Sequence, residues 1–465
     1  MKKLIIVILV LISNPLKSQV TIEKQNYISD FDILIESLVE LHPKLYSCIS
    51  KEEFDQDVKT IRKRLEKIDS KSEAIYVIQE LIYKIGNSHA INTSIYNEPE
   101  LKYVLPFSVF IIDKRVYIKN CPSNKSLNGI ELLEINNSTC ESIIDSLKIF
   151  FPTDGHTNVI SYNIQPLFNG LYGRFCQEKE TNIITTKTGE FIMKSAIKDD
   201  SIYNEMILEN AKAYFGENRY FKQEINEDYS YGYFQFIGFV SKYKGYEIEK
   251  EFYSFIKIAN DKNLKAIIID LRNNNGGDPY LCGKMTSFLS DHPFQLFEKV
   301  FITKTNKPTH IDKMSDKFYF RLRKFKVRKG EELNEIVRFE KGLKIINPKT
   351  DRFKGNIYIL SGALTQSSST MMCNYLKNQK NVIFVGSPQI GAINYFWGNS
   401  HCQIDLSKLN TTFSFAVELI ELEENSSKTD KPIGLPPDYL IQYNIEELII
   451  GVDKEMNFIK SELQK

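Results

Sequence analysis

The sequence has almost no net charge and few cysteines. It holds 60 Lys plus Arg against 59 Asp plus Glu in 465 residues, a formal net charge of +1. This balance gives no electrostatic case for nucleic acid or for a strongly acidic partner. The seven cysteines, at positions 48, 121, 140, 176, 282, 373 and 402, include no C-x-x-C pair. Their spacing excludes the usual zinc sites and small disulfide scaffolds, and the odd count leaves at least one thiol over.

A long apolar run is also missing. The run Leu4–Ile12 in MKKLIIVILVLISNPLKSQV follows two lysines and is too short to cross a bilayer comfortably. With the polar stretch that ends at Ser18, it predicts a secretory signal over residues 1–18, with an uncleaved anchor as the alternative. We therefore expect an exported protein, periplasmic or on the outer surface, without a stable membrane span after signal cleavage.

The chain is long for one domain, and its patterns divide it into three parts. Residues 19–95 have apolar residues at helical spacing, which predicts three helices, the last ending at Gly86. Residues 101–180 begin with a hairpin, a strand and a short helix, and continue as a connection without a clear pattern. Residues 225–465 alternate strands and helices, which predicts an α/β domain with a largely parallel sheet. A basic insertion at about 300–350 interrupts this alternation, and a solvated edge is favoured over a membrane-surface role.

Two segments follow buried strands in the α/β part, where ligands of open sheets bind. In LTQSSSTMMCNYLK, three serines stand between the strand GNIYILS and an apolar helical pattern. A serine there either caps the helix, which is the commoner role, or acts as a nucleophile. In IIIDLRNNNGG, a strand ends in paired glycines. These form an ordinary turn or present backbone N–H groups to a developing oxyanion.

The order of several motifs resembles one family. HPKLY, LIYKIGNSHAIN, LLEINN, IIIDLRNNNGG, the serine segment with NVIFVG, and GLPPDY occur in one succession from about Asp30 to Asp438. This succession is similar to the tail-specific, or carboxy-terminal processing, serine peptidases. It is closest to their tricorn-type and interphotoreceptor-retinoid-binding-protein-like branch. The resemblance implies a ClpP/crotonase-like catalytic core, an N-terminal helical segment and a small PDZ-like β module within residues 101–180.

The resemblance also implies roles for particular residues. The nucleophile of the family falls on Ser367. The backbone N–H of Ser368 would form one half of the oxyanion hole, and Gly276 or Gly277 would provide the other half.

The proton acceptor differs between branches of the family. One branch uses a Lys 25 positions after the nucleophile, where this chain has Ala392. The other uses a His preceded by Ser, which matches Ser88 and His89. Because a group that titrates near neutral pH suits this role, we predict that His89 is the base. His42 in HPKLY is interpreted as packing among the N-terminal helices.

The third part of such a site is a carboxylate that orients the base. In the tricorn-type branch it lies shortly before a C-terminal Pro-Asp. Here Asp430 is the nearest match, with Glu423 and Glu424 as alternatives, and all three also fit solvated loop charges.

Two motifs depart from the family pattern. Thr370 stands where the family has Glu, and its glycine-rich segment is GSPQIGA at 386–392. We predict an exported serine endopeptidase with a Ser/His mechanism, acting on peptide or protein without metal or organic cofactor. The alternative is a catalytically impaired peptide-binding protein on the same scaffold. An acyl-transfer enzyme with a non-peptide substrate, such as an esterase, is a third possibility.

Overall fold

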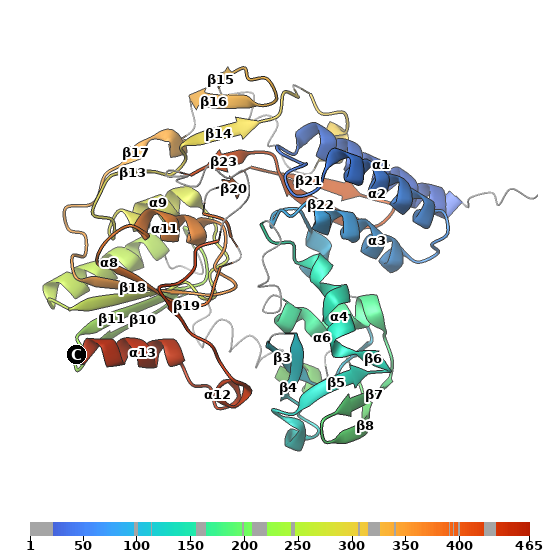
Figure 1. Ribbon diagram of the computed structural model, residues 1–465, viewed down its shortest axis with the longest axis horizontal. Helices are drawn as coiled ribbons and strands as arrows, with labels where there is room; N and C mark the ends of the chain where they lie inside the picture. The colour runs from blue at the N-terminus through green and yellow to red at the C-terminus, as the bar shows by residue number, and fades with distance from the viewer. Residues whose placement is uncertain are drawn as a thin grey trace, which may run out of the picture.

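A computed structural model gives the structure of the chain (Figure 1). It describes residues 22–96, 101–112, 114–154, 164–197, 200–206, 221–242, 247–305, 307–314, 326–338, 341–389, 391–393, 395–398, 400–422 and 434–465. The predicted secretory signal lies outside these residues, as does most of the basic stretch of the insertion. No helix among the described residues is long and apolar enough to cross a membrane.

The catalytic core predicted for the C-terminal part is built on a six-stranded sheet. Its strand order is β10-β11-β12-β18-β19-β24, and all neighbours except β10 and β11 are parallel. The strands are β10 Phe221–Asn226, β11 Tyr231–Phe236, β12 Ala266–Asp270, β18 Asn356–Ser361, β19 Val382–Gly386 and β24 Tyr439–Leu440. This sheet confirms the predicted α/β fold class.

Helices cover both faces of this sheet. They are α8 Ile248–Asp261, α9 Pro279–Thr286, α11 Ser368–Leu376 and α13 Lys454–Leu463. The first three share one apolar core with Ile267 and Ile269 of β12, whereas α13 packs on the opposite face against Ile268. The alternation along β12 explains why this strand reads as a continuous apolar run, because both of its faces are buried.

The N-terminal segment forms the three predicted helices. They are α1 Ile22–Leu41, α2 Lys51–Leu65 and α3 Lys71–Lys84. The last is followed by Gly86 at φ +64°, the left-handed conformation expected of a glycine there. The helices share a core with a hairpin from the far end of the chain, β21 His401–Leu406 and β22 Thr411–Ala416. Strand β1, Ile91–Asn92, adds to this hairpin beside β22.

A β module follows, with its own apolar core. Its strand order is β3-β4-β5-β7-β8, with β6 paired to β5. The elements are β3 Ser108–Ile112, β4 Arg115–Asn120, β5 Glu131–Ile135, β6 Ser138–Thr139, α4 Cys140–Leu147, α6 Phe168–Leu171, β7 Thr181–Thr186 and β8 Gly189–Lys194. The hairpin, strand and short helix expected there are present, whereas β7 and β8 lie beyond residue 180, where the predicted part ended.

A five-stranded sheet lies above the core in Figure 1. Its order is β15-β16-β14-β23-β20, and it joins the stretch around the basic insertion to the region before the C-terminus. The strands are β14 Lys299–Ile302, β15 Lys326–Arg328, β16 Asn334–Arg338, β20 Tyr395–Trp397 and β23 Leu419–Glu421. The remaining elements are β2 Tyr103–Val104 with β9 Ala196–Ile197, β13 Phe294–Gln295 with β17 Ile345–Ile346, and α12 Ile445–Ile449.

Candidate active site

Ser367 occupies the N-cap position of α11, immediately beyond the carboxyl end of β18. Its backbone has φ +58° and ψ −125°, a conformation that costs free energy in a residue with a side chain. Its side chain makes no capping hydrogen bond. The common role of a serine at this position, capping the helix, is therefore not the role of Ser367.

The three serines differ in what their hydroxyl groups do. Ser368 Oγ donates to Gly277 O at 2.7 Å, and Ser369 Oγ donates to Asn274 Oδ1 at 2.6 Å. Both of these residues are fully buried, whereas Ser367 is partly exposed. Ser367 is thus the one serine of the run whose hydroxyl has no hydrogen bond to another described residue.

The glycine turn after β12 lies directly against this serine. Gly276 has φ +98°, and a Cβ placed on it would lie 2.6 Å from Ser367 Cβ and 2.9 Å from Ser368 N. Only glycine allows the two segments to approach so closely. Gly277 has φ +133°, and a Cβ on it would meet the backbone of Phe239.

Asn274 fixes the turn and decides which glycine N–H is available. Its Oδ1 accepts from Gly276 N at 2.9 Å, and its Nδ2 donates to Phe236 O. The Gly276 N–H is therefore engaged within the turn. The N–H groups of Gly277 and Ser368 donate to no other described residue, so these two can bind an oxyanion.

Ser88 and His89 follow α3 in the segment that leads into β1. Ser88 Oγ and His89 Nδ1 are 3.1 Å apart, within hydrogen-bond distance. Asn87 Oδ1 accepts from His89 N at 2.8 Å, and Asn87 Nδ2 lies 2.7 Å from His42 Nε2. The histidine of HPKLY is buried, as predicted, and it also holds the loop that carries the proposed base.

His401, which matched no motif, lies beside His89. Their ring centroids are 5.3 Å apart with an angle of 32° between the planes. The strand order brings them together: His401 pairs with Ala416 of the central strand β22, and His89 precedes Ile91, which pairs with Ser414 of the same strand. Burial, and then His401, lower the pKa of His89 to about 3. The imidazole is therefore neutral at any pH well above this value.

Asp154 connects the histidine segment to the core. Its Oδ1 accepts from Ser88 N at 2.8 Å, and its Oδ2 accepts from Ala392 N at 3.4 Å. The neighbour of Ala392, Gly391, packs on the first turn of α11, since a Cβ there would lie 3.4 Å from Ser367 N. The two halves of the predicted site are thus joined by a short chain of contacts.

The comparison with family models identifies the core. Residues 230–439 match the family model described as peptidase family S41. This stretch is a peptidase family S41 domain. The match confirms the predicted family resemblance and the enzyme class, a serine peptidase. No curated protein matches the chain.

Solved structures show how much of this chain shares a known fold. Mature CPAF complexed with lactacystin aligns with a TM-score of 0.66 and 15% identity, covering 95% of this chain and 98% of that chain. Mature CPAF aligns with the same TM-score and 16% identity, covering 95% and 97%. The photosystem II D1 C-terminal processing protease reaches a TM-score of 0.41 with 12% identity over 93% and 98%. At these identities, CPAF shares the fold of nearly the whole chain.

The two motif departures in the S41 domain lie against each other. A Cβ on Gly391 would be 2.4 Å from Thr370 Oγ1, so the glycine of GSPQIGA packs directly on the threonine that replaces the family's Glu. Thr370 is buried, and its Oγ1 donates to Thr365 O in the segment just before α11. The candidate partner carboxylates Asp430, Glu423 and Glu424 lie outside the described residues.

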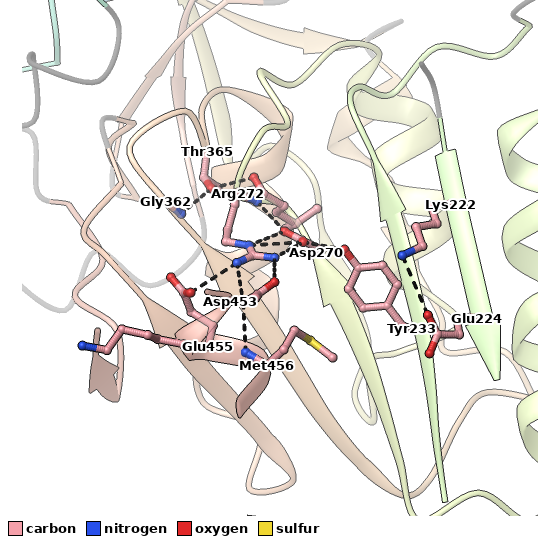
Figure 2. Close-up of polar contacts among 12 residues, drawn as sticks. Lys222, Glu224, Tyr233, Asp270, Arg272, Gly362, Thr365, Asp453, Glu455 and Met456 are labelled. Atoms are coloured by element: carbon pink, nitrogen blue, oxygen red, sulfur yellow. Dashed lines mark hydrogen bonds and ion pairs between the residues drawn. The ribbon is translucent and has the colours of Figure 1, made fainter. Parts of the chain in front are cut away.

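The strand that precedes the glycine turn ends in an ion-pair network around Arg272 (Figure 2). Arg272 binds Asp270 at 2.7 Å and Asp453 through two bonds of 3.0 Å, and it reaches Glu455 at 3.2 Å. Tyr233 donates to Asp270 at 2.7 Å. The Asp-Leu-Arg sequence therefore anchors the C-terminal helix α13 beneath the site.

Proposed function

We propose that the chain is an exported serine endopeptidase in which Ser367 is the nucleophile and His89 the general base. One observation carries this proposal. Of three consecutive serines, only Ser367 combines a strained positive φ, a hydroxyl without a described partner and two unengaged N–H groups beside it. A sharp strand-to-helix turn of this kind, known as a nucleophile elbow, exposes the serine hydroxyl where a substrate carbonyl can reach it.

The chemistry follows from these positions. Ser367 Oγ attacks the peptide carbonyl carbon and its proton passes to His89 Nε2. The N–H groups of Gly277 and Ser368 bind the oxygen that becomes negative. When the tetrahedral intermediate collapses, the C–N bond breaks and the leaving amine takes the proton from His89. Water then attacks the acyl ester, with His89 again accepting and returning a proton.

The β module supports binding of an extended peptide along one particular edge. At β3, Gln165 Oε1 accepts from Ile111 N, and just before the strand Asn169 Nδ2 donates to Leu105 O and Phe107 O. These side chains occupy the groups that an added strand needs. At β8, the outer edge pairs with no described strand and Ile192 is 75% exposed. In the proposed enzyme, substrate adds to β8 in the manner of strand addition.

The activated serine is tested with a fluorophosphonate probe on the purified mature protein. Labelling at Ser367, located by mass spectrometry, is expected for wild type, with loss in Ser367→Ala and a fall of roughly 10²- to 10⁴-fold in rate for His89→Ala. Matched controls are Ser126→Ala and His292→Ala, which change exposed residues away from the site. Absence of labelling in folded wild-type protein would favour the peptide-binding alternative.

Export is tested separately. A secreted chain is expected to begin near residue 19 when its N-terminus is sequenced after expression with its own leader. Retention of Met1 would contradict cleavage and favour the uncleaved anchor.

A further inference from the structure

Asp154 is a buried carboxylate placed where three parts of the chain meet. It follows the first helical stretch of the β module, it accepts from Ser88 in the N-terminal segment, and it accepts from Ala392 in the core. Its exposed fraction is 3%. No Lys, Arg or His among the described residues forms an ion pair with it.

A carboxylate in such a position is costly. Burying a charge without a cation beside it destabilises the folded state, so hydrogen bonds must hold the ionised form. Burial raises the pKa of Asp154 to about 6, while hydrogen bonds from the backbone and side chain of Ser88 and from the Ala392 backbone act in the opposite direction. Three hydrogen-bond donors, two from Ser88 and one from Ala392, therefore converge on this one side chain.

We infer that Asp154 is the carboxylate that positions the Ser88–His89 pair, in place of the C-terminal carboxylate suggested by Asp430. This inference rests on the proposed function. An ionised Asp154 accepts a hydrogen bond from the Ser88 hydroxyl, which keeps its proton. Ser88 Oγ is then left with lone pairs for His89 Nδ1–H, at the observed 3.1 Å. With the proton held on Nδ1, the lone pair of Nε2 is free to take the proton of Ser367.

The electrostatic reason is the desolvated state of His89. An imidazole with a low pKa is a weak base. Here the charged imidazolium is destabilised because it is buried away from water and lies beside His401. A negative carboxylate one hydroxyl away stabilises that imidazolium as it forms. The same carboxylate also fixes the position of the segment that carries Ser88 and His89, because it accepts the Ser88 N–H.

The experiment measures the rate of fluorophosphonate labelling in the full mature chain between pH 4.5 and 9, for wild type, Asp154→Asn, Asp154→Glu and Asp145→Asn. Asp145 is a partly exposed aspartate of the same module and serves as the control. Asp154→Asn is expected to label roughly 10- to 100-fold more slowly at pH 7.5, and Asp154→Glu to recover part of the rate. Asp145→Asn is expected to match wild type.

The pH profile separates positioning from folding. The titratable groups linked through Ser88 are Asp154, which accepts from its N–H, and His89, whose ring lies beside that of His401. The wild-type rate is expected to fall as the pH drops through about 6, because Asp154 then takes up a proton, and this fall should be absent in Asp154→Asn. His89, with its lowered pKa, gives no such fall.

The outcomes are distinguishable. A wild type that does not label at Ser367 overturns the proposed function itself. A wild type that labels through His89, beside an Asp154→Asn protein with the same rate and the same fall near pH 6, overturns only the role of Asp154. A slower Asp154→Asn protein that keeps this fall has lost stability, not positioning, and also contradicts the inference. Thermal melts of each variant confirm that the folded state is being compared.

Discussion

Ser367, Ser368 and Ser369 are the same residue type in consecutive positions, and their surroundings separate them. Two hydroxyls are bonded inward to the glycine turn, and one is not. At this scale the determinants are backbone angles and single contacts. The most demanding of these is the approach of Gly276 to Ser367.

Gly276→Ala is expected to slow the labelling of Ser367 by roughly 10²-fold. The new methyl group would lie 2.6 Å from Ser367 Cβ and 2.8 Å from Gln366 O, so the nucleophile or the turn must move. A displacement of this size reduces the reaction rate by roughly 10²-fold. The control is Gly451→Ala, where φ is +70° and no atom of the described residues lies within 4 Å of the added carbon. An equally large fall in the labelling rate of both variants would mean that backbone strain, and not the contact with Ser367, causes the loss.

His401→Gln is expected to raise the pKa of His89. The neighbouring ring disfavours the charged imidazole, and that effect disappears with the substitution. NMR titration of the six histidine side chains measures the change. His310→Gln, on a surface turn paired with Glu36, is the matched control. An unchanged His89 pKa would mean that burial alone sets it.

The next scale is that of elements, where the segment 386–392 packs on the first turn of α11. Gly391 sits against Thr370, so the two departures from the family pattern fit each other sterically. A larger side chain at 370 would need room where Gly391 now lies. The loss of the family's Glu is thus accompanied by a change in the loop that faces it.

Gly391→Ala is expected to slow labelling and to destabilise the fold by about 1–3 kcal/mol, the usual cost of overpacking. The added carbon would meet Thr370 Oγ1 at 2.4 Å. Thr370→Ala in the same chain removes that atom and should restore part of both losses, measured by urea denaturation and by labelling. Gly434→Ala, whose added carbon meets Gln389 O at an ordinary contact distance of 3.5 Å, should behave like wild type. A double variant no better than the single one would contradict this steric account.

At the scale of the whole molecule, the C-terminal helix closes one face of the core. Arg272 holds it with Asp453 and Glu455, while Asp270 beneath has no exposed side-chain surface. The network thus connects the strand that leads into the oxyanion turn with the last helix of the chain (Figure 2).

Arg272→Met is expected to destabilise the protein by about 3–5 kcal/mol, because it leaves buried carboxylates without a cation. Denaturant unfolding of full-length protein measures the loss. Lys284→Met, which removes an exposed pair with Glu249, should cost at most about 1 kcal/mol. Similar losses of unfolding free energy in both variants would mean that apolar contacts, and not Arg272, hold α13 on the sheet.

Local patterns were enough for most of the architecture. Apolar periodicity predicted the three N-terminal helices, the hairpin of the β module and the alternating strands and helices of the core. Gly86 was identified from its place after α3. Ser367 and the Ser88–His89 pair came from the family resemblance, and their roles stay predictions.

Asp154 and His401 could not be found in this way. Neither stands in a motif, and each gains its position from partners more than 60 residues distant, Ser88 for one and the β1-β22-β21 order for the other. Asn274 was visible in RNNNGG, yet only the turn shows that its side chain occupies the Gly276 N–H. The choice of Gly277 over Gly276 as donor therefore depends on the folded turn.

The sequence by itself determined which residue types were available: a strand ending in paired glycines, a serine at the start of a helix, and a Ser-His pair after another helix. These are local features, set by spacing and backbone propensity. Only the tertiary structure decided which serine hydroxyl and which glycine N–H have no hydrogen bond among the described residues, and which carboxylate reaches Ser88. The physical reason is that hydrogen-bond partnership and burial arise between segments far apart in the chain, and no local pattern contains them.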